Sequence, residues 1–106
     1  MQLEGIDIKF CGFHPNDTTH SYMKEIFERL YDLSPYGCYL EARFTQEQNA
    51  FSGIIQINSS VGKFFAIATG ERVMDVLHKA VEQILQQVNR WKSERFNVTE
   101  PVNVNA

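Results

Sequence analysis

The periodic stretch from Gly70 to Trp91 constrains the fold more than any other part of the chain. Apolar residues recur there at steps of three and four, which is the spacing of one face of an α-helix. Six residues form this stripe: Met74, Leu77, Val81, Ile84, Val88 and Trp91. No glycine or proline interrupts it, and Gly70 just before it is typical of a turn out of a strand. The pattern predicts a helix whose apolar face packs on a sheet.

The polar side of this predicted helix carries a line of basic and amide residues. At about 100° per residue, five side chains fall along one flank: Arg72, Lys79, Gln83, Gln86 and Arg90. Lys92 and Arg95 continue the basic character. Asp75 and Glu82 lie on the neighbouring flank, so the charge is sorted rather than mixed. This sorting favours an anion-binding helix, and a solvated face on a core-packing helix is the alternative interpretation.

The rest of the chain contains four strand patterns and one further helical pattern. The strand patterns occupy residues 2–12, 38–45, 51–59 and 63–69, and a helical apolar face occupies residues 19–33. The resulting order, β-α-β-β-β-α, predicts an α+β fold built as a two-layer sandwich. Its four-stranded sheet carries both helices on one face.

The connections between these segments predict how the strands pair. A strand, a crossover helix and a second strand predict a parallel pair, whereas three strands joined by short turns predict an antiparallel meander. Two helices with one apolar face each cover one side of the sheet, so the other side is open to solvent. In the fourth strand, Phe64 and Phe65 compete for the covered side.

The length of 106 residues indicates one domain. We assign residues 1–96 to it and residues 97–106 to a flexible tail, because the helical pattern decays after Trp91 and the tail has little to bury. The sequence has no signal-peptide pattern and no apolar run long enough to span a membrane, which predicts a cytoplasmic protein. Cys11 and Cys38 lie outside metal-binding spacings and are interpreted as reduced thiols.

The sequence contains no recognisable catalytic constellation. His14, His20 and His78 are scattered over a loop, a helix start and a helix flank. No nucleophile and base occur in a familiar order, and there is no nucleotide-binding glycine pattern. We therefore expect a binding protein that is not an enzyme and that has no metal, cofactor or small-molecule substrate.

Two surfaces remain as candidates for binding. The net charge of -3 gives no global attraction to nucleic acid or to an anionic membrane. Residues 71–95, however, hold five basic and four acidic side chains, a net of +1, against five and nine elsewhere, a net of -4. This local excess could support a modest RNA contact. On the open sheet face, Tyr39, Ile54 and one of the two phenylalanines could stack on bases or form a dimer seam.

Three segments carry a resemblance to a known family. The sequence F-S-G-I-I-Q-I-N-S-S-V-G-K at residues 51–63 looks like that family's third strand and turn, an aromatic followed by A-x-I-N-x-x-x-G. Residues 64–70 look like its fourth strand, and residues 73–90 look like its final helix, M-Y-x-A-I-D-x-L-x-x-K-L-x-R-Q-L-x-K. Together with the order of elements, these segments resemble the ribosome hibernation promoting factor and ribosome-associated inhibitor family, also called sigma modulation proteins.

The resemblance implies a short-form factor that binds the small ribosomal subunit near its decoding centre, where it blocks mRNA and tRNA and stores idle ribosomes. In the family, basic residues on both helices contact ribosomal RNA. By position, Arg90 retains a basic site, whereas Gln83 and Gln86 stand where the family usually has Lys or Arg. The first helix, normally basic, is acidic here, and the C-terminal dimerisation domain of longer members is not present in this sequence.

We therefore predict a ribosome-associated translation inhibitor that binds the ribosomal RNA of the small subunit. The expected contacts are Arg72, Lys79, Gln83, Gln86, Arg90, Lys92 and Arg95. The alternative is a diverged protein-interaction module that acts as a homodimer or hetero-complex through its open sheet face. The negative net charge and the acidic first helix favour this alternative.

Overall fold

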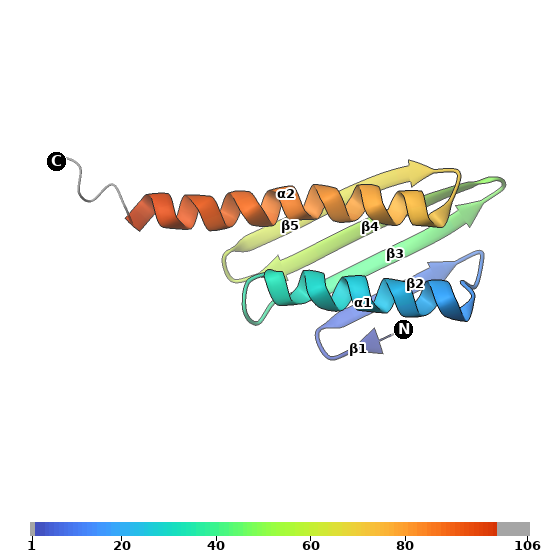
Figure 1. The fold of residues 1–106 in the computed structure, drawn as a ribbon, viewed down its shortest axis with the longest axis horizontal. Coiled ribbons are helices and arrows are strands. Elements are labelled where there is room, and N and C mark those ends of the chain that lie inside the picture. The colour runs from blue at the N-terminus through green and yellow to red at the C-terminus, as the bar shows by residue number, and fades with distance from the viewer. Residues whose placement is uncertain (1, 100–106) are drawn as a thin grey trace.

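A five-stranded sheet forms one layer of the structure and two helices form the other (Figure 1). The structure is a computed structural model that describes residues 2–99. Its elements in chain order are β1 (Gln2–Leu3), β2 (Ile6–Cys11), α1 (Asp17–Leu33), β3 (Tyr39–Glu47), β4 (Ala50–Ser59), β5 (Gly62–Gly70) and α2 (Val73–Thr99). The four long strands and the two helices follow the predicted order, which confirms the α+β fold class.

The pairing of the strands also agrees with the sequence. β2 and β3 are parallel and are connected through α1, and β3, β4 and β5 form an antiparallel meander. Both helices lie on the same side of the sheet (Figure 1). The largest fully buried side chains come from both layers: Ile8, Leu40, Phe44, Ile55 and Ile57 from the sheet, and Met23, Phe27, Leu30, Val76, Leu77, Ile84 and Val88 from the helices.

The segment expected to be one strand over residues 2–12 is divided in two. Gly5 has a φ of 81°, a left-handed conformation that favours glycine, and the chain reverses there so that Leu3 pairs with Ile6. A Cβ atom on Gly5 would lie 2.5 Å from the hydroxyl oxygen of Tyr31, so another residue here would strain the turn and displace the Tyr31 ring. The expectation of one continuous strand is therefore wrong, and the two-residue β1 is added at the edge of the four long strands.

Local hydrogen bonds explain the limits of α1. The Asn16 side chain accepts a hydrogen bond from the Thr19 amide at 2.8 Å, which caps the start of the helix. At the other end, the Ser34 hydroxyl donates to the Leu30 carbonyl oxygen at 2.7 Å, and Pro35 follows. The helix therefore begins at Asp17, two residues before the expected start.

The register of β5 decides between the two adjacent phenylalanines. Phe64 points into the core and is 8% exposed, whereas Phe65 points to the uncovered face and is 45% exposed. The covered and uncovered sides of β5 then alternate, with Ala66 and Ala68 buried beneath the helices.

α2 continues through Thr99, about two turns beyond the expected end near Trp91. No proline occurs after Trp91 until Pro101, so nothing in the sequence stops the helix. The first residues of the expected tail are therefore helical, and residues 100–106 lie outside the described part of the chain. Trp91 packs on Phe64 with ring centroids 6.4 Å apart, and the Arg95 guanidinium carbon lies 5.0 Å from the centroid of the Trp91 ring.

Candidate nucleic-acid interface

The helix expected to bind RNA lies above one edge of the sheet. α2 packs over β4 and β5, and β5 is the outermost strand on that side (Figure 1). One flank of α2 faces α1, where the His78 ring nitrogen Nε2 lies 3.4 Å from the Tyr22 hydroxyl. The opposite flank therefore runs beside the free edge of β5, and this is the flank that carries the line of basic and amide residues.

Three side chains of this flank bind the backbone of β5. Gln87 Nε2 donates to the Phe65 carbonyl oxygen at 2.6 Å, and Gln87 Oε1 accepts from the Phe65 amide at 2.9 Å. Gln83 makes the same pair of bonds with Ile67, at 2.9 Å and 3.3 Å.

The third member is Lys79, whose Nζ donates to the Thr69 carbonyl oxygen at 3.1 Å. We call Lys79, Gln83 and Gln87 the edge ladder.

The spacing of helix and strand explains why the edge ladder forms. Four residues of an α-helix rise about 6 Å, and two residues of a strand extend about 6.6 Å, so each turn of α2 meets the next outward-facing residue of β5. Backbone amides and carbonyls at a sheet edge otherwise have no strand partner. The edge ladder thus fixes α2 to β5 and determines which polar side chains of α2 remain unbound.

The two glutamines predicted as RNA contacts have different surroundings. Gln83 is half-buried and its amide is used by Ile67, whereas Gln86 is exposed. Gln87, which was not among the predicted residues, belongs to the edge ladder instead. The four-residue spacing of Lys79, Gln83 and Gln87 was visible in the sequence, but its meaning depends on which strand lies beside the helix.

Three of the seven predicted residues share one face of α2: Lys79, Gln86 and Arg90. Arg72 lies just before the helix and lines the same shallow hollow as Lys79. We call these four residues the α2 flank. Gln86 and Arg90 each fall within about 20° of Lys79 around the helix axis. All four are exposed, and within residues 2–99 neither Arg72 nor Arg90 has an ion pair. The Cα atoms of Lys79 and Arg90 are separated by roughly 16 Å along the helix axis.

Lys92 and Arg95 do not belong to this line. Lys92 falls about 40° from His78 around the helix, on the side that faces α1. Arg95 stacks over Trp91 near the end of the sheet. The structure therefore separates these two predicted contacts from the α2 flank.

Acidic residues limit the positive surface on both sides. A shallow hollow at the start of α2 is lined by Gly70, Glu71, Arg72, Asp75, His78 and Lys79, so carboxylates lie beside the cations. On α1, Glu25, Glu28 and Asp32 are exposed. A polyanion approaching the α2 flank meets less repulsion from the β5 side than across α1.

The described part of the chain can also be compared with the requirements of a metal site, a reactive thiol and a membrane-spanning helix. Residues 2–99 contain no group of three or more His, Cys, Asp or Glu side chains placed to hold a metal ion. Burial raises the pKa of the Cys38 thiol, which keeps it protonated in the core, whereas Cys11 is exposed. None of the helices in this part combines the length and the apolar composition needed to cross a membrane.

Comparison with known proteins gives a match in structure but not in sequence. No protein-family model and no curated protein matches the sequence. The crystal structure of the Thermus thermophilus Protein Y N-terminal domain superposes with a TM-score of 0.69, covering 80% of this chain and 94% of that chain at 14% identity. The chain has the Protein Y fold.

A ribosomal subunit interface protein from Coxiella burnetii has the same fold. Its TM-score is 0.68, with 10% identity, and the match covers 83% of this chain and 97% of that chain. The Protein Y fold agrees with the family expected from residues 51–90. At such low identity the likeness concerns the fold, and the side chains of α2 must be judged on their own geometry.

Proposed function

We propose that this protein is a ribosome-associated regulator, non-enzymatic and cytoplasmic, that binds ribosomal RNA of the small subunit through the α2 flank. The observation that supports it most is the Protein Y fold. A protein called a ribosomal subunit interface protein shares this fold over 83% of this chain and 97% of that chain. The sorted charge of α2 supports the same surface.

The α2 flank supplies three cations and one amide for this contact. Arg72 and Arg90 have exposed guanidinium groups, and Lys79 keeps two N–H donors after its bond to Thr69. Gln86 adds a neutral hydrogen-bonding group. Gln83 acts indirectly in this proposal, because its bonds to Ile67 hold the flank in position. Lys92 and Arg95 would contact RNA only if a second RNA segment lay near the end of α2.

The number of cations sets the expected salt dependence. With about three phosphate contacts, the slope of log K against log salt for single-stranded RNA is roughly -2. Raising the salt from 50 to 200 mM should therefore weaken binding about 20-fold. The exposed carboxylates of α1 oppose phosphate, so we expect the first helix to contribute nothing favourable.

The test is co-sedimentation of the protein with purified bacterial ribosomes and with isolated small subunits, at 50 and 200 mM salt. The variant Arg72→Glu/Arg90→Glu should lose most of the pelleting seen at 50 mM. The matched control is Lys24→Glu/Arg29→Glu on α1, which lowers the net charge by the same amount at exposed positions. This control should pellet as the natural protein does or only slightly less.

Two results would overturn the proposal. Pelleting of Arg72→Glu/Arg90→Glu that equals the natural protein would remove the α2 flank as the contact. If the natural protein pellets at neither 50 nor 200 mM salt, ribosome association itself is excluded. Circular dichroism of each variant checks that the domain remains folded.

A further inference from the structure

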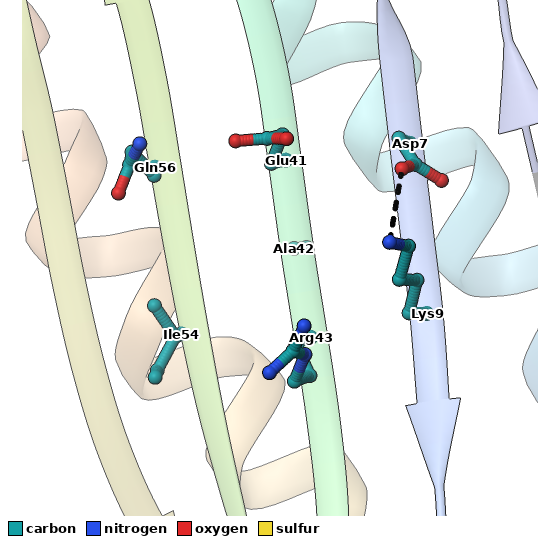
Figure 2. Close-up of a pocket in the computed structure, with 7 residues that line it drawn as sticks. All are labelled: Asp7, Lys9, Glu41, Ala42, Arg43, Ile54 and Gln56. Carbon is teal, nitrogen blue, oxygen red and sulfur yellow. Dashed lines mark ion pairs between the residues drawn. The ribbon is translucent and has the colours of Figure 1, made fainter.

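The uncovered face of the sheet carries its side chains in two contrasting rows. The strand register places Asp7, Glu41, Gln56 and Phe65 side by side, and we call these the acidic row. Two residues further along each strand, the register places Lys9, Arg43, Ile54 and Ile67 side by side, and we call these the basic row. Figure 2 shows Glu41 and Gln56 at one level and Arg43 and Ile54 at the next.

Like charges are neighbours within each row. Asp7 is the register partner of Glu41, and Lys9 is the register partner of Arg43. Like charges directly opposite on adjacent strands are destabilising. The Lys9 ammonium lies 3.9 Å from an Asp7 carboxylate oxygen, which relieves part of this repulsion. Within residues 2–99, Glu41 and Arg43 have no such ion pair.

The other end of both rows is apolar and exposed. Ile54 is 37% exposed, Phe65 is 45% exposed and Ile67 is 54% exposed. Ile54 and Ile67 are register partners, and Phe65 lies two residues from Ile67 on the same face of β5. The three side chains therefore form one continuous apolar patch beside the charged residues, a combination typical of an interaction surface.

We propose that this face is a two-fold interface between two copies of this chain. A two-fold axis in the plane of the face, perpendicular to the strands and between the two rows, turns each face onto the other and reverses the strand direction. The acidic row of one copy then lies opposite the basic row of the second copy. Glu41 meets Arg43, Asp7 meets Lys9 and Phe65 meets Ile67, and each contact occurs twice, as an isologous interface requires.

The pattern of charged and apolar side chains on this face is therefore self-complementary. The same rotation pairs Gln56 with Ile54, so no like charges meet across the two central rows. Packed sheets cross at about 30°, which keeps the match close near the axis, where these rows lie. This proposal does not depend on ribosome binding, because it uses the side of the sheet away from both helices (Figure 1).

The size of the face indicates a weak dimer. The four long strands, β2 to β5, hold 6, 9, 10 and 9 residues. At about 3.3 Å per residue and about 4.8 Å between strands, they cover on the order of 500 Å² per copy. The total is at the low end of interfaces between proteins, where complexes are weak and transient. We therefore expect a weak dimer that forms only in concentrated solution.

The test is sedimentation velocity of the full chain from about 10 µM to 1 mM at 50 mM salt, with a reducing agent because Cys11 is exposed on a neighbouring position of β2. Two single variants, Glu41→Arg and Arg43→Glu, each bring like charges together at both copies of the contact. Each should weaken self-association about tenfold or more. Glu28→Arg and Arg29→Glu on α1 are the matched controls, with the same changes in charge, and should dimerise as the natural protein does.

The decisive sample is an equal mixture of Glu41→Arg and Arg43→Glu. Residue 41 of one variant then meets an opposite charge at residue 43 of the other, twice over, so the mixture should recover the dimer that each variant alone has lost. Both variants keep a negative net charge, so general attraction does not explain such recovery. A monomer at 1 mM, or a dimer that neither single variant weakens, would overturn the proposal, and the monomer would leave the face for a different partner.

Discussion

At the scale of single residues, Gly53 shows how closely the two layers approach. A Cβ atom at this position would lie 2.7 Å from Cγ1 of Val76 and 2.8 Å from Cε1 of Phe44. Both of these side chains are fully buried, so neither has free space to move into. In the sequence, Gly53 looks like a weak point in a β-branched strand. In the structure, it is the position at which α2 rests on β4.

We expect Gly53→Ala to lower the free energy of unfolding by about 1–3 kcal/mol, because the added methyl overpacks the core. Urea denaturation followed by circular dichroism measures this change. Val76→Ala removes the group that the new methyl strikes, so the double variant should be more stable than the sum of the two single effects predicts. Strict additivity would show that contact with Val76 is not the cause. Ser52→Ala, on the neighbouring position, should change stability by less than about 0.5 kcal/mol.

At the scale of elements, α2 and β5 are joined by side chains as well as by the core. The edge ladder explains why glutamines that look alike in the sequence have different roles. Gln83 and Gln87 each bind one residue of β5, whereas Gln86 between them is exposed. Their positions around the helix separate them, but the bonds depend on β5 being the outermost strand and on its direction beside α2.

We expect Gln83→Ala/Gln87→Ala to destabilise the protein by about 2 kcal/mol or more, because four hydrogen bonds are lost at about 0.5–1.5 kcal/mol each. Hydrogen exchange at the Phe65 and Ile67 amides should accelerate, because these amides lose their acceptors. Gln86→Ala is the control from the same turn and should leave both quantities nearly unchanged. Unaltered exchange at Phe65 and Ile67 in the double variant would mean that the ladder contributes no protection.

At the scale of the whole molecule, the two proposed surfaces face in different directions. The α2 flank belongs to the helical layer, which covers one side of the sheet (Figure 1). The acidic and basic rows lie on the other side, since they alternate along each strand with the buried residues. The charge of the chain divides in a similar manner, since residues 71–95 hold a net of +1, five basic against four acidic, within a chain of net charge -3. A face-to-face dimer would leave both α2 flanks accessible.

The two surfaces should therefore respond independently to substitution. Arg72→Glu/Arg90→Glu should lose ribosome pelleting and keep its self-association constant within about twofold, because its charges lie far from the two-fold axis. Glu41→Arg should lose self-association and keep ribosome pelleting. Ribosome co-sedimentation and sedimentation velocity, each applied to both variants, measure this independence. A loss of pelleting by Glu41→Arg would mean that the sheet face, rather than α2 alone, touches the ribosome.

Periodicity alone predicted the order of the elements, the parallel pair and the placement of both helices on one side, since each depends on which residues must be buried. It did not predict the turn at Gly5, because a left-handed glycine within an alternating pattern gives no signal of its own. Nor did it predict the length of α2, because polar helix formers after Trp91 resemble a tail. The α2 flank was visible as a line of charge, but the use of Gln83 and Gln87 depended on tertiary neighbours.

The edge ladder also protects one edge of the sheet from pairing with strands of other copies of this chain. A sheet whose outer strand is unpaired can add further strands repeatedly, which leads to fibrils. Here a visiting strand would find the outward groups of Phe65 and Ile67 already occupied by glutamine side chains of the same molecule. In the proposed dimer, association through the sheet face uses that face in both copies, and the edge ladder keeps β5 from recruiting a further strand. We therefore expect self-association through these two regions to stop at the dimer.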